Sequence, residues 1–256
     1  MLQFDAETAR RIEATYTTPD VVAQRREVRR LLAPRPGEHI VDIGAGPGFL
    51  AAELAADVGP AGRVYAIDPS ASMRDLARAR GVDLAIEDGS AEALPLPDGS
   101  VDAAVATQVL EYVPDVPGAL AEMRRVLRPG GRVLLLDTDW DSVVWHSGDA
   151  DRTRAVLAAW EEHLADPYLP RTLGGALREA GFTEVTPSVW PLFNAGADRD
   201  TFSNGLVPVI AAFVVGRRGV TAETARGWVD DLAALGEATF FSINRYLFRA
   251  RVPGGR

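Results

Sequence analysis

The sequence predicts an α/β protein built on a doubly wound, mostly parallel sheet. Short apolar runs that suit buried strands alternate with helical patterns through residues 37–137. The first run, residues 40–43, passes through glycines at alternate positions, Gly44, Gly46 and Gly48, into a helical pattern. A strand, a glycine turn and a helix in this order are typical of a βαβ unit that binds a nucleotide at the helix start.

Composition limits the classes of function. The chain has 256 residues, which suits one α/β domain with insertions. Its net charge of −9 disfavours nucleic acid as a partner. The chain has no cysteine, which excludes disulfides and thiolate chemistry. Its three histidines are scattered along the sequence, so we expect no metal site. The chain starts without a leader-like segment and has no run long enough to span a membrane, so we expect a cytoplasmic protein with no membrane partner.

The spacing of the glycines separates two kinds of nucleotide site. In the dinucleotide fingerprint a third small residue falls three positions after the second glycine, where this chain has Phe49. Here the third glycine comes one residue earlier, and an acidic residue lies two positions before the first. This pattern resembles the first motif of class I S-adenosylmethionine (SAM)-dependent methyltransferases and disfavours an NAD-dependent oxidoreductase. The resemblance implies that the loop binds SAM through Asp42, Gly44, Ala45, Gly46 and Gly48.

The second strand, residues 63–67, ends at Asp68, twenty residues past the last loop glycine. A carboxylate there can accept hydrogen bonds from both ribose hydroxyls, and it can also cap the following helix. Pro69 and Met73 follow, and Met73 would pack against adenine or in the core.

A second family motif lies in residues 88–102, which resemble the segment that binds adenine in these methyltransferases. Ser90 stands where that family usually has an aspartate, and a hydroxyl is the weaker partner for the adenine amino group. The adenine contact is therefore divided between Ser90, Ala91 and Asp88.

The exit of the fourth strand, residues 102–107, faces the methyl acceptor in the family. We expect Gln108 to contact SAM and Tyr112 to donate a hydrogen bond to the acceptor. Glu111 would act as a base if burial raised its pKa, or would be a first-turn helix carboxylate favoured by the dipole.

The segment after the fifth strand, residues 132–137, concentrates aromatic, acidic and histidine side chains at the edge where ligands bind in such sheets. We interpret Asp139 and His146 as acceptor-site residues, with His146 as base or orienting donor. The alternative is a surface loop whose tryptophans pack under other elements.

The remaining segments suggest a covered acceptor site within one domain, residues 1–256. Residues 1–36 form an N-terminal helical cap, where Tyr16 reaches the cofactor or packs between helices. Residues 138–175 and 194–238 are insertions with helical patterns, the second very apolar, which we interpret as a lid. Dimerisation through the apolar helix is the alternative, so a monomer or a homodimer is expected.

The resemblance implies a seven-stranded Rossmann-like sheet with strand order 3-2-1-4-5-7-6, whose core is residues 37–137 and whose antiparallel last strand is residues 239–252. It implies a methyltransferase of the UbiE type that uses SAM, releases S-adenosylhomocysteine and methylates an O, N or C atom of a medium-sized, partly apolar small molecule. A SAM-binding cyclase or a binding protein on the same fold is the alternative.

Overall fold

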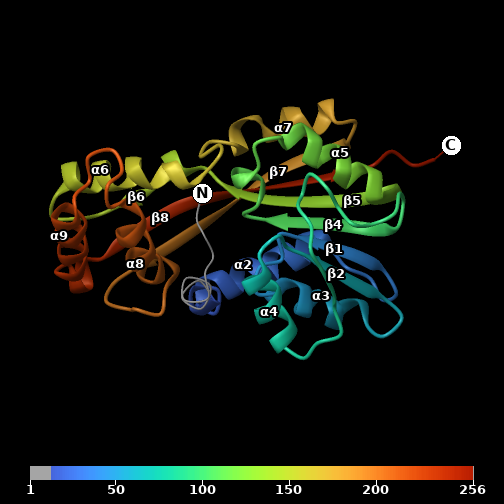
Figure 1. Ribbon diagram of the computed structural model, residues 1–256, viewed down its shortest axis with the longest axis horizontal. Helices are drawn as coiled ribbons and strands as arrows, with labels where there is room; N and C mark the ends of the chain where they lie inside the picture. Colours follow the sequence, from blue (N-terminus) through green and yellow to red (C-terminus); the bar gives the residue numbers. More distant parts are fainter. Residues whose placement is uncertain (1–12, 256) are drawn as a thin grey trace.

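The computed structural model of the protein describes residues 13–255. It has one sheet with helices on both faces and further helices at one end (Figure 1). The sheet order is β3-β2-β1-β4-β5-β8-β6, and β7 pairs with β8. The strands are β1 (His39–Ile43), β2 (Arg63–Ile67), β3 (Ala85–Glu87), β4 (Val101–Thr107), β5 (Leu127–Thr138), β6 (Val144–Trp145), β7 (Thr183–Ala195) and β8 (Phe240–Arg251).

The predicted fold class is confirmed. Strands β1 to β5 pair in parallel, and β8 is antiparallel to β5, β6 and β7. With β7 as the sixth main strand and β8 as the seventh, the order is the expected 3-2-1-4-5-7-6. The short strand β6 was not predicted, because two residues carry no readable pattern. It pairs with the start of β8, at Ser242 and Phe241.

The helices are α2 (Pro19–Leu32), α3 (Phe49–Val58), α4 (Ala71–Ala79), α5 (Val116–Val126), α6 (Ala150–Trp160), α7 (Pro170–Glu179), α8 (Phe202–Val214) and α9 (Ala222–Ala233). Helix α2 begins after Thr18 with Pro19 in its first turn, as predicted. The first twelve residues of the predicted N-terminal helical cap lie outside the described residues. Helix α5 ends at Val126, three residues before Pro129, because the chain already pairs as strand β5 from Leu127.

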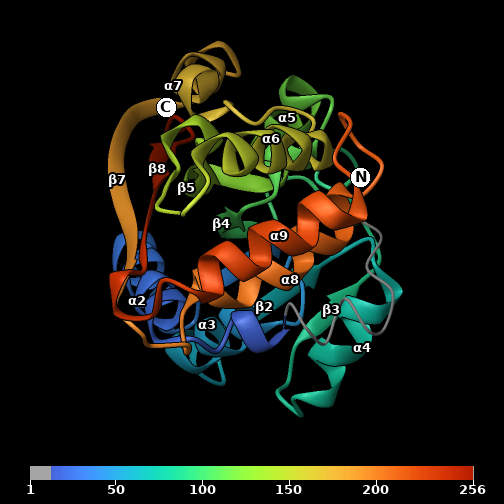
Figure 2. The same cartoon turned by 90° about the vertical axis from the view of Figure 1, so that its left-hand side faces the viewer.

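Alternate residues of the central strands separate two cores. Leu134 and Leu136 of β5 pack with α2 and α3, whereas Leu135 packs with α5 and α7 on the other face. A third core joins α6, α8 and α9, which we call the outer helices, to the extended ends of β7 and β8 (Figure 2). The fully buried Trp160 and Trp228 lie in this third core. The apolar helix α8 therefore packs within its own chain.

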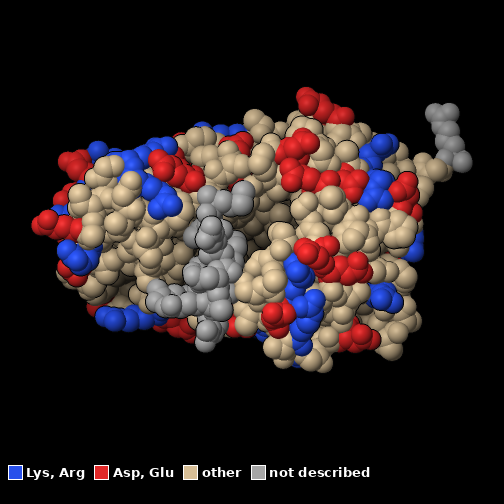
Figure 3. All heavy atoms as spheres, in the orientation of Figure 1, with Lys and Arg blue, Asp and Glu red and all other residues tan. Residues whose placement is uncertain are grey.

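Surface charge and helix length bear on whether nucleic acid or a membrane could be a partner. Figure 3 shows acidic and basic side chains interspersed over the face that it draws. In the part of the chain that the structure describes, every helix is too short or too polar to span a lipid bilayer.

Candidate active site

A cavity of about 400 Å³ lies at the carboxyl ends of β1, β2 and β4, under the start of α8. Ligands bind at this edge in doubly wound sheets. One half is lined by the glycine loop and polar loop residues: Gly44, Gly46, Asp68, Pro69, Ser70, Met73, Gly89, Ser90, Ala91, Glu92, Thr107, Gln108 and Val109. The other half is mostly aromatic and apolar: Thr15, Tyr16, Tyr112, Val113, Pro114, Trp140, Trp160, Phe202, Leu206 and Val209.

The three loop glycines have different roles. All have positive φ, between 55° and 78°. A Cβ at Gly44 would lie 2.4 Å from a Val109 methyl, and one at Gly48 would lie 2.8 Å from Ala77. Those two glycines are therefore required by packing inside the protein. A Cβ at Gly46 would meet nothing within 4 Å, so Gly46 presents bare backbone to the cavity.

Asp68 joins the end of β2 to this loop. Its carboxylate accepts hydrogen bonds from the backbone N–H groups of Gly46 and Ser70, each at 2.8 Å. It therefore holds the turn that leads into α4, whose N-cap is Ser70 and not Asp68 as the capping interpretation expected. Asp68 also lines the cavity, so its backbone contacts are compatible with ligand binding. Burial raises the pKa of Asp68, and the two backbone donors partly offset this.

Asp42, Ala45 and Gly48 were also expected to contact the cofactor, and the structure places these three residues outside the cavity lining. Asp42 is buried behind the loop, where it accepts a hydrogen bond from the backbone of Ala51 in the first turn of α3. Burial, together with the charge of Asp68, raises its pKa to about 8. The Ala45 N–H donates to the Ile67 carbonyl at 3.0 Å. These residues hold the loop rather than the ligand.

The segment expected to meet adenine does reach the cavity. Pro69, Met73, Ser90 and Ala91 all line it. Asp88 does not, because its carboxylate pairs with Arg74 at 2.9 Å on the exposed side. This placement leaves Ser90 and Ala91 as the members of that segment beside the cavity.

Gln108 occupies a strained position at the exit of β4. Its φ is 56°, which is uncommon for a residue with a side chain. Its side-chain amide donates to the Thr138 hydroxyl at 3.0 Å, and it lines the cavity. Strain of this kind is typical of functional sites.

The aromatic half is backed by a histidine. Trp160 stacks on His163 with ring centroids 3.7 Å apart, and Tyr112 and Trp140 meet the same ring edge-on. Burial lowers the pKa of His163 to about 4, so the ring is neutral at physiological pH. His163 therefore acts as a neutral packing group behind the cavity wall.

Glu111 lies behind this wall and does not line the cavity. It is fully buried and accepts a hydrogen bond from the Thr138 N–H at 2.9 Å. Burial raises its pKa to about 7, and the positive charge of Arg245 opposes the rise. Asp137 is also fully buried, with a raised pKa, and accepts from the N–H groups of Val109 and Glu111. The pair supports the turn that carries Tyr112.

The prediction that Asp139 and His146 form the acceptor site is contradicted by their placement. Asp139 forms a two-bond ion pair with Arg171, at 2.8 and 2.9 Å, and does not line the cavity. His146 is exposed beyond β6, and its N–H donates to the Phe240 carbonyl at 3.0 Å. Pairing of β6 with β8 carries His146 away, and only Trp140 of this segment lines the cavity.

Several cavity residues escaped prediction. Glu92 and Thr107 line the cavity next to Ala91 and Gln108, which were predicted cofactor contacts. That adjacency was the only feature of the sequence that could have identified them. Phe202, Leu206 and Val209 are spaced on one face of α8, which the sequence identified as apolar without showing what it covers. Trp160 likewise carried only a helical packing signal.

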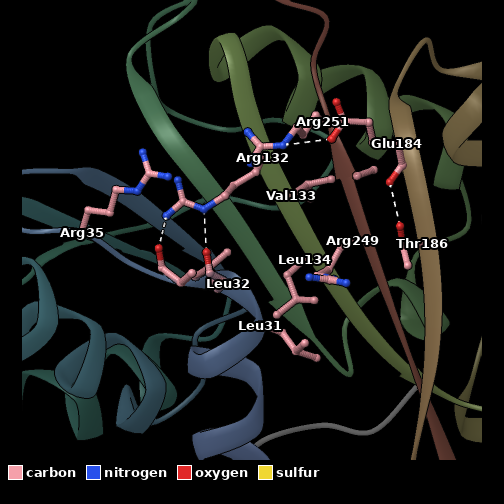
Figure 4. Close-up of a pocket in the computed structure, with 12 residues that line it drawn as sticks. Leu31, Leu32, Arg35, Arg132, Val133, Leu134, Glu184, Thr186, Arg249 and Arg251 are labelled. Atoms are coloured by element: carbon pink, nitrogen blue, oxygen red, sulfur yellow. Dashed lines mark hydrogen bonds and ion pairs between the residues drawn. The ribbon is translucent and has the colours of Figure 1, made fainter.

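A second cavity, of about 290 Å³, lies between the end of α2, β5, β7 and β8 (Figure 4). Its arginines are mostly engaged in the fold. Arg132 donates to the Leu32 carbonyl and pairs with Glu38, and Arg251 pairs with Glu184 at 3.3 Å. It has no glycine loop, so the cavity at the ends of β1, β2 and β4 remains the candidate site.

Comparison with known proteins agrees with this geometry. Residues 41–135 match a family model described as a methyltransferase domain. A demethylmenaquinone methyltransferase from Symbiobacterium thermophilum is 37% identical over 177 residues, which are 59% of this chain and 70% of that protein. A 37.1 kDa protein in transposon TN4556 of Streptomyces fradiae is 37% identical over 225 residues. That match covers 79% of this chain but only 60% of the relative, less than two thirds of its length.

Among solved structures, the [4+2]-cyclase SpnF is similar over most of both chains. The match has a TM-score of 0.58 and 26% identity, and covers 91% of this chain and 82% of that one.

Proposed function

We propose, from the premise that this chain belongs to the class I SAM-dependent methyltransferases, that it methylates a partly apolar small molecule in the aromatic half of its cavity. The main support for this proposal is that one continuous cavity is lined by Gly46 and Asp68 at one end and by Tyr112 and Trp160 at the other. One cavity can therefore hold a nucleoside at one end and an apolar acceptor at the other.

The residues of the polar half fit the cofactor. Gly46 leaves backbone open to the cavity, and Asp68 offers a carboxylate at the strand end where ribose hydroxyls bind in such folds. Met73 and Ala91 provide apolar contacts beside Ser90 for an adenine ring. Bound SAM supplies a methyl group made electrophilic by its sulfonium.

The chain's own task is then to orient an acceptor atom and exclude water. Positioning of this kind lowers a barrier by roughly 7–11 kcal/mol. Trp140, Trp160 and Phe202 are buried side chains that wall the aromatic half, and Leu206 of α8 covers it. Tyr112 lines the same half and offers a hydroxyl to an acceptor oxygen. Burial keeps the Tyr112 pKa well above its usual value, so this hydroxyl acts as a donor.

The relative from Symbiobacterium thermophilum is named for demethylmenaquinone, a quinone whose reduced form is a dihydroxylated aromatic ring. A flat hydroxylated aromatic ring also suits a cavity walled by two tryptophans. We therefore propose a hydroxylated aromatic compound as the acceptor. Whether carbon or oxygen is methylated depends on which acceptor atom Tyr112 leaves facing the methyl group.

Methyl transfer can be tested with methyl-labelled SAM and a panel of dihydroxynaphthalenes, hydroxyquinols and simple phenols. Label in the organic product, with one S-adenosylhomocysteine released per methyl, is the expected result. Tyr112→Phe should lower the rate with the accepted compound. Failure of every panel member to gain label, with SAM bound to the protein, would contradict the proposed acceptor class.

A cyclase is the second candidate function, and the similarity to SpnF favours it. Among residues 13–255, the cavity lining contains no histidine, and its carboxylates, Asp68 and Glu92, lie in the cofactor half. An enclosed apolar surface is sufficient for a reaction that needs no proton transfer. A cyclase would bind SAM and convert a polyene without consuming SAM, so the label experiment separates the two functions.

A further inference from the structure

Arg245 is a fully buried cation close to the aromatic half of the cavity. It lies on β8, opposite Thr138 of β5 and Trp190 of β7, with 1% of its surface exposed. Its Nη1 donates to the side-chain oxygen of Gln24, itself buried on α2. The guanidinium carbon lies 4.4 Å from the ring centre of Phe202, which lines the cavity.

Most of the hydrogen-bonding capacity of Arg245 is unused. Its Nε and Nη2 atoms are buried without a hydrogen-bond partner in the part of the chain that the structure describes. No carboxylate of residues 13–255 lies within ion-pair distance of it, since Arg245 is absent from every ion pair found there. Burying a charge is costly unless it is paired and hydrogen-bonded. A purely structural role therefore gives no reason to keep an arginine here.

The nearby acidic groups do not form ion pairs with Arg245. Glu111 exerts the largest favourable charge effect on Arg245, but its carboxylate is hydrogen-bonded to the Thr138 backbone and forms no ion pair with Arg245. Asp20 also acts at a distance, and its carboxylate is already engaged by Asn194 at 2.7 Å and by the Phe202 N–H at 2.9 Å. The positive charge thus lies without an ion-pair partner among residues 13–255, against Phe202, whose side chain lines the cavity.

Tyr16 connects this charge to the cavity. It lines the aromatic half, and its backbone carbonyl accepts from Arg25 at 2.5 Å, which fixes its position before α2. Among the described residues, Arg245 is the cation whose charge lowers the pKa of Tyr16, whereas burial and the charges of Asp68 and Glu111 raise it. That hydroxyl makes no hydrogen bond within the described chain, and burial raises the pKa of Tyr16, so it remains a donor.

We propose that Tyr16 and Arg245 form an anion-recognition site, in which the Tyr16 hydroxyl donates to a carboxylate or other ionised oxygen of a bound substrate and Arg245 compensates its charge. This inference rests on the proposed function, because the anion belongs either to the amino-acid end of SAM or to the acceptor. Tyr16 is the residue that touches the ligand, and Arg245 is a positioning residue behind it. This anion-recognition site would make the aromatic half of the cavity selective for a ligand that carries a negative charge.

The test compares two pairs of probes in calorimetric titrations. S-adenosylhomocysteine and 5′-methylthioadenosine differ in the amino-acid end that carries the carboxylate. With the S-adenosylhomocysteine complex, 1-naphthoate and 1-naphthamide differ in charge but little in shape. The proteins are the wild type, Arg245→Met and Tyr16→Phe, with Arg249→Met as control because Arg249 is exposed on the same strand.

In one of the two pairs, Arg245→Met and Tyr16→Phe should each lower the wild-type preference for the probe that carries the carboxylate by about tenfold or more. This is the scale of a hydrogen bond to a charged group. A change in the nucleoside pair assigns the anion to SAM, and a change in the naphthalene pair assigns it to the acceptor. Arg249→Met should change neither. Preferences that stay within about twofold of wild type in both variants overturn the proposal.

Thermal unfolding separates this role from a structural one. Replacing a buried, unpaired cation by an apolar side chain of similar length should leave the melting temperature unchanged or raise it. A lower melting temperature with both preferences unchanged would assign Arg245 to the fold and overturn the proposal. If Arg245→Met does not fold, Tyr16→Phe decides, since it removes only a hydroxyl. Failure of the wild type to bind S-adenosylhomocysteine would contradict the proposed function instead.

Discussion

The carboxylate of Asp68 accepts a hydrogen bond from the backbone N–H of Gly46 at 2.8 Å. This contact ties the end of β2 to the glycine loop that follows β1, although the residues are 22 positions apart. It brings together the bare backbone and the acidic group that a nucleoside needs, on one wall of one cavity. The predictions below depend on this arrangement.

Gly46→Val should abolish binding of S-adenosylhomocysteine, because the added side chain would occupy the ligand's space. Within the protein a Cβ at Gly46 meets nothing within 4 Å, so any loss of stability comes from its φ of 55°, about 1–3 kcal/mol. Gly37→Val is the matched control, with φ of 82° and equally open space. Equal affinity in the two variants would exclude this placement of the ligand.

Asp68→Ala should weaken S-adenosylhomocysteine binding by about 1.5–3 kcal/mol, since hydrogen bonds to a charged acceptor are lost. Asp115→Ala is the control for helix capping, because Asp115 caps α5 through the Gly118 N–H at 2.9 Å. The control should lower stability by about 1 kcal/mol and leave affinity unchanged. An unaltered dissociation constant for Asp68→Ala would restrict Asp68 to its backbone contacts.

Stability should fall with rising pH because of Asp42. The folded protein holds this proton up to about pH 8, whereas the unfolded chain releases it near the ordinary value of 3.8. The unfolded state therefore binds fewer protons between these limits, and the free energy of unfolding falls by up to about 1.4 kcal/mol per pH unit. Urea unfolding at pH 5, 6 and 7 gives the free energy of unfolding at each pH. For Asp42→Asn this free energy should fall less steeply with rising pH than it does for the wild type. The exposed Asp75 is the control. The same pH dependence of stability in Asp42→Asn and in Asp75→Asn would disprove the assignment.

Leu206→Ala should raise the KM for the acceptor about fivefold or more and leave S-adenosylhomocysteine affinity within about twofold, because α8 covers only the aromatic half. Val215→Ala, just beyond the end of α8 and 43% exposed, is the control. Steady-state kinetics and calorimetry measure the two effects. A parallel loss of cofactor affinity would show that α8 also shapes the nucleoside half.

His146→Ala should leave kcat/KM within about twofold of wild type. The imidazole is exposed beyond β6, and the residue does not line the cavity. A fall of about tenfold or more, with unchanged stability, would return this segment to the acceptor site.

The sheet order followed from the resemblance to a family, and the residues that line one half of the cavity could be predicted because short motifs contain them. Gly46, Asp68, Ser90 and Gln108 each lie within a turn of a predicted strand end, so local pattern places them. The aromatic half depends on long-range packing. Phe202, which lines the cavity, donates its backbone N–H to Asp20, 182 positions earlier. His146 was misplaced for the same reason, since pairing of β6 with β8 leaves no local signal.

The most direct measurement is calorimetric titration of the purified protein with S-adenosylhomocysteine, with NADH titrated in parallel. We expect micromolar affinity for the first ligand, loss of that affinity in Gly46→Val, and no binding of NADH, since Phe49 stands where a dinucleotide fingerprint needs a small residue. Absence of binding to the folded wild-type protein would contradict the assignment of this cavity to SAM.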